Sequence, residues 1–329
     1  MSETISYAEA AVRALADAMT NDDTVVAVGE DLGRGGIFGQ YRGLVERFGA
    51  RRIIDAPISE ATIVGASVGM ALTGLRPVVE MRVVDFALCA IDEIVNQAAK
   101  NRFMFGGQGR VPMVIRMPSG IWSGSAGQHS QSLESWFAHI PGLVVVAPAT
   151  VQDNYTLLRA AIASDDPVIY LEHKESWGQT GECSDLPADG ADREALLGTL
   201  GRAAIRRAGH DITVVTWSKA VHWVMDAAAE LAECGVSVEV IDLRTLYPWD
   251  EQTVMDSVGR TGRLMVVHEA VQSGGWGAEI AATVAERTGK PVARYGAPRT
   301  TVGYASVLEQ AVRLDGARIA ARIGQWLAS

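Results

Sequence analysis

The feature that most constrains the fold of this chain is a series of short apolar segments separated by segments with helical periodicity. In the first half, the pattern predicts strands at 24–31, 51–57, 76–84, 111–117, 143–149 and 167–173. It predicts helices at 7–20, 59–74, 86–104, 132–139 and 151–164, the first of them capped by Ser6. Strands that are apolar on both faces and alternate with helices indicate a mainly parallel sheet with both faces covered.

The pattern stops at 174–199, a polar stretch with glycine, proline and aspartate, and then resumes. We predict that this stretch is a linker between two domains. The second series has strands at 212–218, 236–243, 263–270 and 291–296, and helices at 220–234, 250–259 and 276–288. A chain of 329 residues suffices for two domains of ordinary size. The sequence therefore predicts an α/β fold with domains at 1–185 and 186–329.

Composition narrows the classes of function. There are 39 acidic and 29 basic side chains, so the net charge is −10 and no basic excess is left to bind nucleic acid. No apolar run reaches the roughly 18 residues that a membrane span needs, and residues 1–19 lack the pattern of a signal peptide. The three scattered cysteines, Cys89, Cys183 and Cys234, form no CxxC pair and suit a reduced compartment. These observations predict a cytoplasmic protein without nucleic-acid or membrane partners.

The segment 55–74 is the most informative part of the chain. A strand is expected to end at Asp55, and Ser59 is placed to cap a helix whose first turn carries Glu60. The helix dipole partly stabilises a carboxylate at that position. The local pattern leaves two interpretations open. Glu60 is either a first-turn capping acid or an acid/base group at the carboxyl edge of a parallel sheet, where α/β proteins bind ligands.

A second candidate is the glycine- and serine-rich loop 118–136, which presents His129. An imidazole suits proton transfer near neutral pH, although a structural or solvated histidine is the more common case. The neighbouring Ser130 and Ser132 do not indicate a hydrolase, because adjacent residues in a loop do not form a triad and neither serine lies in a GxSxG elbow. The HEA triplet at 268–270 ends a strand of the second domain. A structural role is the simpler interpretation, and a hydrogen-bonded pair at an interface is the alternative.

The glycine-rich segment GEDLGRGGIFG at 29–39 resembles a phosphate loop only superficially. It matches neither GxGxxG nor GxxxxGK[ST], and its acidic pair Glu30 and Asp31 would repel phosphate. The local motifs therefore do not support a claim of nucleotide binding, and the absence of a flavin phosphate loop argues against a flavodoxin-like electron carrier.

Seven blocks in order resemble one family over nearly the whole chain. That family comprises the β subunits of thiamine-diphosphate-dependent 2-oxo acid dehydrogenases, the decarboxylating first components of the pyruvate, branched-chain 2-oxo acid and acetoin complexes. The blocks are GED–G–GG–FG (29–39), D-P-ISEA–IVGA–GMA–GLRPVVE (55–80), DF–AIDEIVNQAAK–R–MFGGQ (85–108), QHSQS–W–AHIPGLVVVAP (128–148), AAI–DDPVIYLEHK (160–174), VEVIDLRTL-P-D (238–250) and GRLMVVHEA (262–270).

The resemblance implies a pyrimidine-binding α/β domain followed by a transketolase C-terminal-like domain. In this family the cofactor lies between the β chain and an α chain, whose GDG…N segment holds Mg²⁺ and the diphosphate. The present sequence has only the triplet ADG at 188–190, so the chain is not expected to hold Mg²⁺–diphosphate by itself. The implied assembly is an α2β2 heterotetramer with β–β contact, and the second domain would dock a lipoyl acyltransferase, a partner whose basic surface an acidic chain would suit.

The resemblance also assigns roles to single residues. Glu60 matches the glutamate that contacts a ring nitrogen of the aminopyrimidine and activates the cofactor, a role that favours the catalytic interpretation over the capping one. Ile58 and Phe86 match positions that line the pyrimidine pocket, and His129 matches the histidine near the thiazolium. That histidine is assigned to orienting substrate or handling protons during acyl transfer to the lipoyl group.

A potassium site is implied as well. Several members of the family hold a potassium ion on β-chain oxygens, chiefly carbonyls, as suits a hard cation. The matching positions in this sequence are Met113, Ala161, Ile162, Ser164 and Asp166.

The prediction from the sequence is thus the β subunit of a heterotetrameric dehydrogenase. It would decarboxylate a 2-oxo acid, or cleave acetoin, on thiamine diphosphate and pass the acyl group to a lipoyl arm. The blocks at 85–108 lean towards acetoin-type relatives, while 296–304 departs from the family pattern. One alternative is a thiamine-dependent carboligase or transketolase-like split enzyme without a lipoyl partner. A non-enzymatic assembly subunit of the same fold is another.

Overall fold

The computed structural model describes residues 2–186 and 193–328. Its contacts divide the chain into two compact units: residues 1–119 with 136–200, and residues 120–135 with 201–329. This division falls at 200/201 rather than after residue 185, and it assigns the segment 120–135 to the second unit. In the described ranges, no helix combines the length and the apolar character that crossing a membrane requires.

The sheet of the N-terminal unit has the strand order β6-β7-β5-β4-β2-β3, and all five of these pairings are parallel. This confirms the parallel sheet expected from the doubly apolar strands. Its strands are β2 (Val25–Gly29), β3 (Ile53–Asp55), β4 (Arg76–Glu80), β5 (Val114–Ser119), β6 (Val144–Val146) and β7 (Val168–His173). Because the strands are parallel, all their carboxyl ends lie at one edge.

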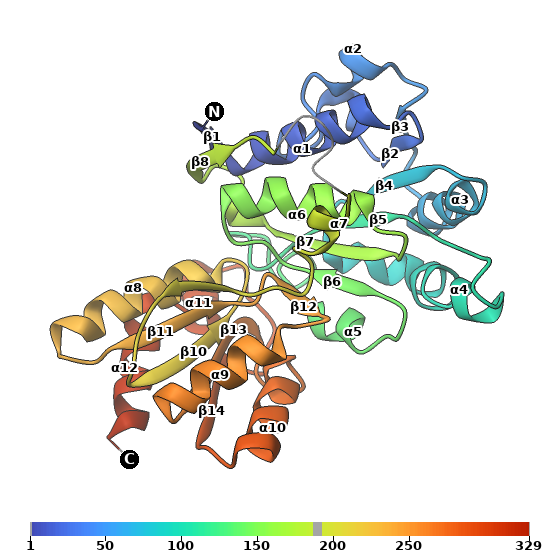
Figure 1. The fold of residues 1–329 in the computed structure, drawn as a ribbon. Helices are drawn as coiled ribbons and strands as arrows, with labels where there is room; N and C mark the ends of the chain where they lie inside the picture. The colour runs from blue at the N-terminus through green and yellow to red at the C-terminus, as the bar shows by residue number, and fades with distance from the viewer. Residues whose placement is uncertain (1, 187–192, 329) are drawn as a thin grey trace. The chain divides into compact units, whose positions relative to one another are not determined.

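Helices cover both faces of this sheet (Figure 1). The α-helices are α1 (Tyr7–Asn21), α2 (Leu44–Phe48), α3 (Glu60–Leu72), α4 (Asn101–Met104), α5 (Glu134–Ala138), α6 (Val151–Ala163) and α7 (Arg193–Leu197). Helix α1 begins with a capping box: the Ser6 hydroxyl accepts from the Glu9 N–H, and the Glu9 carboxylate accepts from the Ser6 N–H. The prediction of Ser6 as the N-cap is therefore confirmed.

The expected helix at 86–104 is not continuous. The chain forms a 3₁₀ segment at Val84–Ala90, a π-helical turn at Glu93–Ala98 and then α4. Two further 3₁₀ turns lie at Leu32–Arg34 and Lys174–Ser176. A helix-like spacing of buried side chains persists through the broken segment, at Ala87, Ala90, Ile94 and Ala98. Apolar spacing therefore indicates the buried face, but it does not specify the hydrogen-bond step.

The stretch 174–199 is not a simple linker. It contains β8 (Thr180–Ser184), which pairs antiparallel with β1 (Ser2–Ser6), and α7, which packs on α6. Both strands of this pair are largely exposed, so neither carries the apolar run by which a strand is recognised in a sequence. The division at 200/201 follows, because these elements contact the N-terminal unit.

A buried cluster of charges crosses the N-terminal sheet. Arg116 on β5 is fully buried and donates from Nε and Nη2 to the two carboxylate oxygens of Glu172 on β7, both at 2.9 Å. Its Nη1 lies 3.6 Å from Oε2 of Glu80 on β4. Gln40 and Tyr41 also donate to Glu80, at 3.0 and 2.9 Å. Burial raises the pKa of Glu80 to about 7, although Arg116 opposes that shift.

The C-terminal unit has a mixed sheet with the order β14-β13-β10-β11-β9, in which only the edge pair β11–β9 is antiparallel. Its strands are β9 (Ala204–Arg207), β10 (Ile212–Thr216), β11 (Val238–Asp242), β13 (Leu264–Val271) and β14 (Val292–Ala297), with a short β12 (Thr245–Tyr247) nearby in sequence. The four strands predicted for this domain are confirmed, and β9 and β12 are additional.

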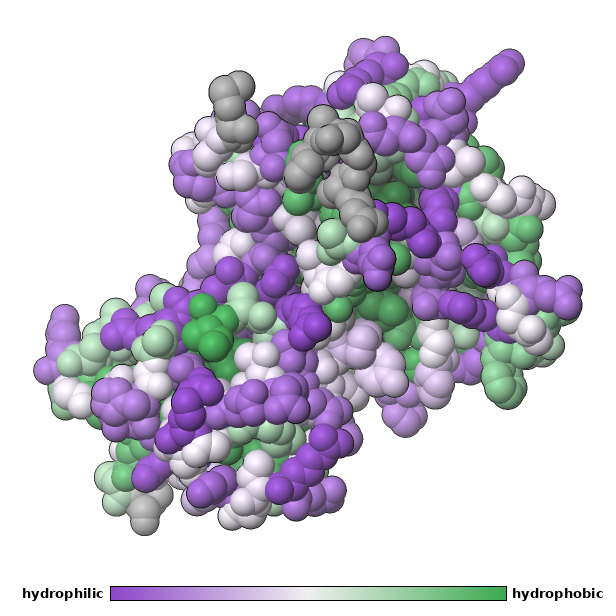
Figure 2. Space-filling view, in the orientation of Figure 1, coloured by the Kyte–Doolittle hydropathy of each residue, from purple (hydrophilic) through white to green (hydrophobic). Residues whose placement is uncertain are grey.

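Five helices accompany these strands: α8 (Ala220–Glu233), α9 (Glu251–Thr261), α10 (Gly277–Thr288), α11 (Ser306–Val312) and α12 (Gly316–Leu327). Helices α8 and α12 pack together on one face, while α9 and α10 lie on the other (Figure 1). Val224, Ile319 and Ile323 bury their side chains in the core between the helices and the sheet. On the face visible in Figure 2, hydrophilic residues predominate and hydrophobic ones lie scattered among them, as is normal for a folded protein.

Candidate functional site

Three neighbouring parallel strands of the N-terminal unit lead to Glu60, Glu30 and Phe86 at one edge of the sheet. Strands β3, β2 and β4 are adjacent, and the chain leaves their carboxyl ends towards Glu60, Glu30 and Phe86, respectively. The loop after β2 is held against the end of β3, because the Gly33 N–H donates to the Asp55 carboxylate at 3.0 Å. The carboxyl edge of a parallel sheet is the usual ligand-binding edge in α/β folds.

Glu60 is the first residue of α3 and is half-buried. Ser59 occupies the N-cap position but makes no capping hydrogen bond, and its hydroxyl donates to Thr62 Oγ1 at 2.8 Å instead. Ser59 therefore has the predicted N-cap position, but its side chain does not make the capping hydrogen bond that this prediction implied. With no side-chain cap, the dipole of α3 is left to act on the carboxylate in its first turn.

A second carboxylate lies close to Glu60. Burial raises the pKa of Glu30, and the charge of Glu60 raises it further. The neighbouring Arg82 acts in the opposite direction and donates from Nη1 to Asp31 at 2.9 Å. The sequence alone identified Glu30 only as an acid that would repel phosphate. The structure adds that it is electrostatically coupled to Glu60.

Ile58 and Phe86 differ in their surroundings. Ile58 leaves 78% of its surface exposed just before α3, whereas Phe86 is half-buried in the 3₁₀ segment that follows β4. A large apolar side chain exposed beside a carboxylate suits one wall of an aromatic ligand's pocket. The same edge carries Glu30, Asp55 and Glu60, acids that would repel a diphosphate, while Asp31 is paired with Arg82. The residues therefore fit the pyrimidine end of thiamine diphosphate and not its diphosphate end.

His129 belongs to the C-terminal unit, within the segment 120–135. It is half-buried, and its backbone N–H donates to the Ala126 carbonyl at 3.4 Å. Ala126 has a φ of 54°, a left-handed conformation that turns the chain just before His129. The base of the loop closes where the Gly120 N–H donates to the Gln131 carbonyl at 2.9 Å.

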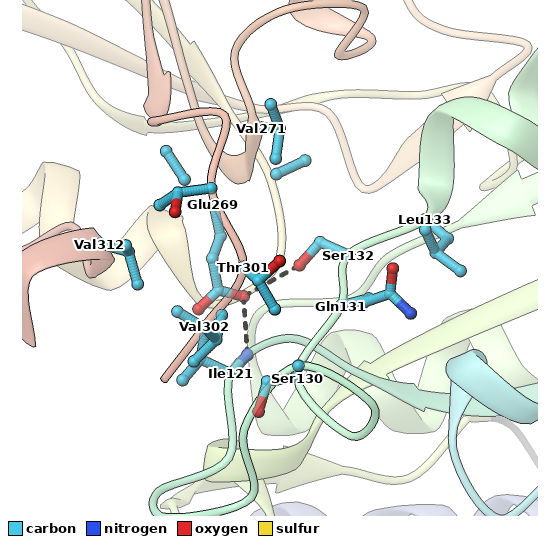
Figure 3. A pocket seen from close by; sticks show the side chains of 14 residues that line it. Ile121, Ser130, Gln131, Ser132, Leu133, Glu269, Val271, Thr301, Val302 and Val312 are labelled. Atoms are coloured by element: carbon cyan, nitrogen blue, oxygen red, sulfur yellow. Dashed lines mark hydrogen bonds between the residues drawn. The ribbon is translucent and has the colours of Figure 1, made fainter. Parts of the chain in front are cut away.

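A cavity of about 180 Å³ lies beside this loop within the C-terminal unit (Figure 3). Ser130, Ser132, Thr300, Thr301 and Glu269 line it with polar groups, and Ile121, Val302 and Val312 contribute apolar side chains. Glu269 enters it from β13, so the HEA triplet reaches a cavity wall as well as a strand end. No spacing or motif along the chain connects Glu269 with the loop.

Two titratable residues of the loop and of β13, Glu134 and His268, are buried. Burial raises the pKa of Glu134 to about 7, and its carboxylate accepts from Trp217 Nε1 at 3.2 Å. Burial also lowers the pKa of His268 to about 4, so this histidine is neutral at pH 7. The His268 ring stacks on Trp217 with centroids 5.1 Å apart. His268 therefore behaves as a structural residue, in line with the simpler interpretation of HEA.

The residues that resemble potassium ligands lie in the N-terminal unit: Met113 directly before β5, Ala161 and Ile162 in the last turn of α6, and Ser164 and Asp166 between α6 and β7. This is the amino edge of the sheet, opposite to Glu60. The Ile162 and Ser164 carbonyls both accept from Arg76 Nη1, at 3.2 and 2.8 Å. The carbonyls of Met113 and Ala161 accept backbone hydrogen bonds, and Asp166 pairs with Arg102. A potassium ion would have to share these oxygens, and the site stays a prediction.

Within the described ranges, no group of three or more His, Cys, Asp or Glu side chains is arranged to hold a metal ion. The ADG triplet at 188–190 lies outside the described residues. It is the triplet of this chain that is similar to the GDG…N segment.

Two domain families match the two halves of the chain. Residues 3–179 match the transketolase pyrimidine-binding domain, and residues 201–319 match the transketolase C-terminal domain. A solved structure titled as a split-gene transketolase in an inactive β4 tetramer superposes with a TM-score of 0.77 over 98% of each chain, at 19% identity. That likeness concerns the fold, and it confirms the predicted architecture.

Curated relatives are more similar in sequence. The pyruvate dehydrogenase E1 subunit β of Rhizobium meliloti is 40% identical over 93% of this chain, which spans 66% of that longer protein. Two Bacillus subtilis proteins are covered over 93% of their length: the 2-oxoisovalerate dehydrogenase subunit β at 36% identity and the acetoin:2,6-dichlorophenolindophenol oxidoreductase subunit β at 39%. With both transketolase-type domains in order and relatives of this kind over nearly its whole length, the chain belongs to the family of β subunits of 2-oxo acid and acetoin dehydrogenases.

Proposed function

We propose that this chain is the β subunit of a thiamine-diphosphate-dependent dehydrogenase that acts on a 2-oxo acid or on acetoin. It works with an α subunit and passes the acyl group to a lipoyl arm. The observation that carries the proposal is the position of Glu60: a half-buried carboxylate at the sheet's carboxyl edge, coupled to Glu30 and adjacent to the exposed Ile58. The names of the relatives support the reaction class.

Glu60, Ile58 and Phe86 would hold the aminopyrimidine. The chemistry that thiamine diphosphate supplies when bound is stabilisation of the carbanion left when the bond beside the substrate carbonyl breaks. Glu60 would hold a proton at a ring nitrogen of the aminopyrimidine. Burial and the neighbouring charge of Glu60 raise the pKa of Glu30, so Glu30 retains a proton more readily than an isolated acid does. Ile58 and Phe86 would exclude water from that proton.

The rest of the cofactor site would come from the partner. The acids at this edge argue against binding of the diphosphate by this chain, so an α subunit would supply Mg²⁺ and the diphosphate contacts. An α2β2 assembly, a lipoyl acyltransferase partner and a cytoplasmic location belong to the same proposal. A potassium ion on the carbonyls near Arg76 is a separate part of it, which exchange of K⁺ for Na⁺ in the assay would test.

Coexpression with an α subunit and a substrate panel tests the function. Pyruvate, 3-methyl-2-oxobutanoate and acetoin would each be supplied to the purified complex, with dye reduction as the readout. We expect reduction with at least one of them, dependent on added thiamine diphosphate and Mg²⁺. A carboligase without a lipoyl partner would instead join two carbonyl substrates and leave both the dye and a lipoyl domain unreduced.

Replacing His129 by Ala is expected to lower kcat by about 10²-fold, the usual contribution of one positioned proton-transfer group, with much less effect on cofactor retention. The measurement is steady-state dye reduction and lipoyl acylation by the complex, together with a thiamine diphosphate titration. His210→Ala is the matched control, because the side chain of His210 is 80% exposed. Kinetics equal to wild type would remove His129 from the mechanism.

A further inference from the structure

The His129 loop, residues 120–135, is rich in small residues in the part that precedes His129. Between Gly120 and Gly127 it contains three glycines and two serines, which permit many backbone conformations. Its internal hydrogen bonds include Trp122 N–H to Ser130 Oγ at 3.3 Å and Ser125 N–H to the Trp122 carbonyl at 3.0 Å. A catalytic imidazole on such a loop needs support from outside it.

Glu269 supplies one such support. It projects from β13, and its Oε2 accepts from the Ile121 N–H at 3.3 Å and from the Ser132 hydroxyl at 3.2 Å (Figure 3). Ile121 and Ser132 stand on the two opposite arms of the loop, on either side of His129 in sequence. A single carboxylate therefore ties both arms to the sheet of the C-terminal unit.

Glu309 supplies a second support, nearer the tip. It lies on α11 with 2% of its surface exposed, and its Oε2 accepts from the Gly124 N–H at 2.8 Å. Arg313 Nε donates to the other oxygen at 2.9 Å and so fixes the carboxylate. Burial alone would raise the pKa of Glu309, but the hydrogen bonds from Gly124 and Arg313 hold that pKa below its ordinary value. The bond to Gly124 is therefore charge-assisted, the stronger kind.

The tip of the loop also meets a third element. A Cβ atom added to Gly127 would lie 2.4 Å from Cγ2 of Thr301, closer than real Cβ contacts allow. The backbone two residues before His129 thus packs directly on the segment 300–302. Contacts at Ile121, Gly124, Gly127 and Ser132 bracket His129 from both sides, and all belong to one unit.

We propose that Glu309 and Glu269 are positioning residues that fix His129 for its part in the reaction. The inference rests on the proposed function of His129 and extends it to two carboxylates that do not touch the reacting atoms. A displacement of about 1 Å at a catalytic group can cost about 10²-fold in rate. Release of the Gly124 N–H from Glu309 allows a displacement of that kind.

A double-mutant cycle on the α–β complex tests the proposal. We expect Glu309→Ala to lower kcat by about 10- to 100-fold, and Glu309→Gln, which retains an oxygen acceptor for Gly124, to lower it less. In a His129→Ala background, Glu309→Ala should lower kcat by less than about threefold, because Glu309 acts on the rate through the imidazole that this background lacks. Ser132→Ala, which removes one donor to Glu269, should show the same dependence on His129 with a smaller effect.

Independent, multiplicative effects of Glu309→Ala and His129→Ala on kcat would overturn the inference. Should Glu309→Ala not yield a folded complex, Glu309→Gln and Ser132→Ala carry the cycle alone. Glu286→Ala, at an exposed position on α10, is the control and should leave kcat unchanged. If His129→Ala is itself silent, the proposed role of His129 fails. If His129→Ala lowers kcat but the effect of Glu309→Ala does not depend on His129, the role of His129 stands and only the positioning role of Glu309 is refuted.

Discussion

Replacing Glu60 by Gln is expected to lower kcat of the α–β complex by about 10²–10⁴-fold, the range for loss of a general acid or base. The amide has nearly the same shape and keeps hydrogen-bonding capacity, so folding and subunit assembly should survive. It carries no exchangeable acid proton, and it removes the charge that raises the pKa of Glu30. Steady-state dye reduction with the preferred substrate measures the effect.

The control for this variant is Glu46→Gln, because Glu46 is an exposed carboxylate on α2 of the same unit. Its kcat should match wild type. Glu60→Asp retains the acid on a shorter arm and should recover part of the lost rate. A Glu60→Gln complex with wild-type kcat would exclude the catalytic role and would favour a non-enzymatic assembly subunit.

Replacing Arg116 by Met is expected to cost about 3–5 kcal/mol of unfolding free energy. Arg116 is the fully buried cation beside two buried carboxylates, Glu80 and Glu172. The substitution leaves both acids in the sheet without their counter-charge. Each must then bind a proton or bear its charge in a medium of low polarity.

Urea unfolding of the full chain, followed by tryptophan fluorescence, measures this cost. The pKa of Glu80 is already raised from 4.5 to about 7 in the folded protein. A raised carboxyl pKa lowers stability as pH rises through that window, because the folded state binds more protons than the unfolded state. Without Arg116 the pKa of Glu80 should rise further. The loss of unfolding free energy relative to wild type should therefore be larger at pH 8 than at pH 5.5.

Arg110→Met is the matched control, since the Arg110 side chain is 61% exposed and pairs with Asp165 at 3.2 Å. An exposed pair of this kind contributes about 1 kcal/mol or less. If the two methionine variants unfold at the same urea concentration, the buried cluster does not have the importance assigned to it.

Most of the fold was predictable because the signals are local or repetitive. The doubly apolar strands β4, β5 and β7 indicated a parallel sheet, and Ser6 with Glu9 specified the start of α1. Strands β1 and β8 were not predictable in this way, since their partners are about 180 residues apart and their faces are polar. Their stability comes from pairing, which no local pattern records.

The candidate site was predictable only in part. Glu60 follows a strand and opens a helix, so its place at the sheet edge follows from topology. The contacts of Glu269 and Glu309 with the His129 loop join segments more than a hundred residues apart, and no local pattern connects either residue to that loop. The use of the Ile162 and Ser164 carbonyls by Arg76 is equally non-local. Backbone carbonyls leave no trace in residue identity.

The central claim is that Glu60 acts on a coenzyme held mostly by another polypeptide. Hydrogen–deuterium exchange at the thiazolium carbon, read by NMR after rapid acid quench, follows the proton that this carboxylate would help to remove. In the assembled complex we predict fast exchange with Glu60, exchange slower by about 10²-fold or more with Gln at that position, and no tight coenzyme binding by the isolated chain. Equal exchange rates in the two complexes, or micromolar binding without a partner, would contradict it.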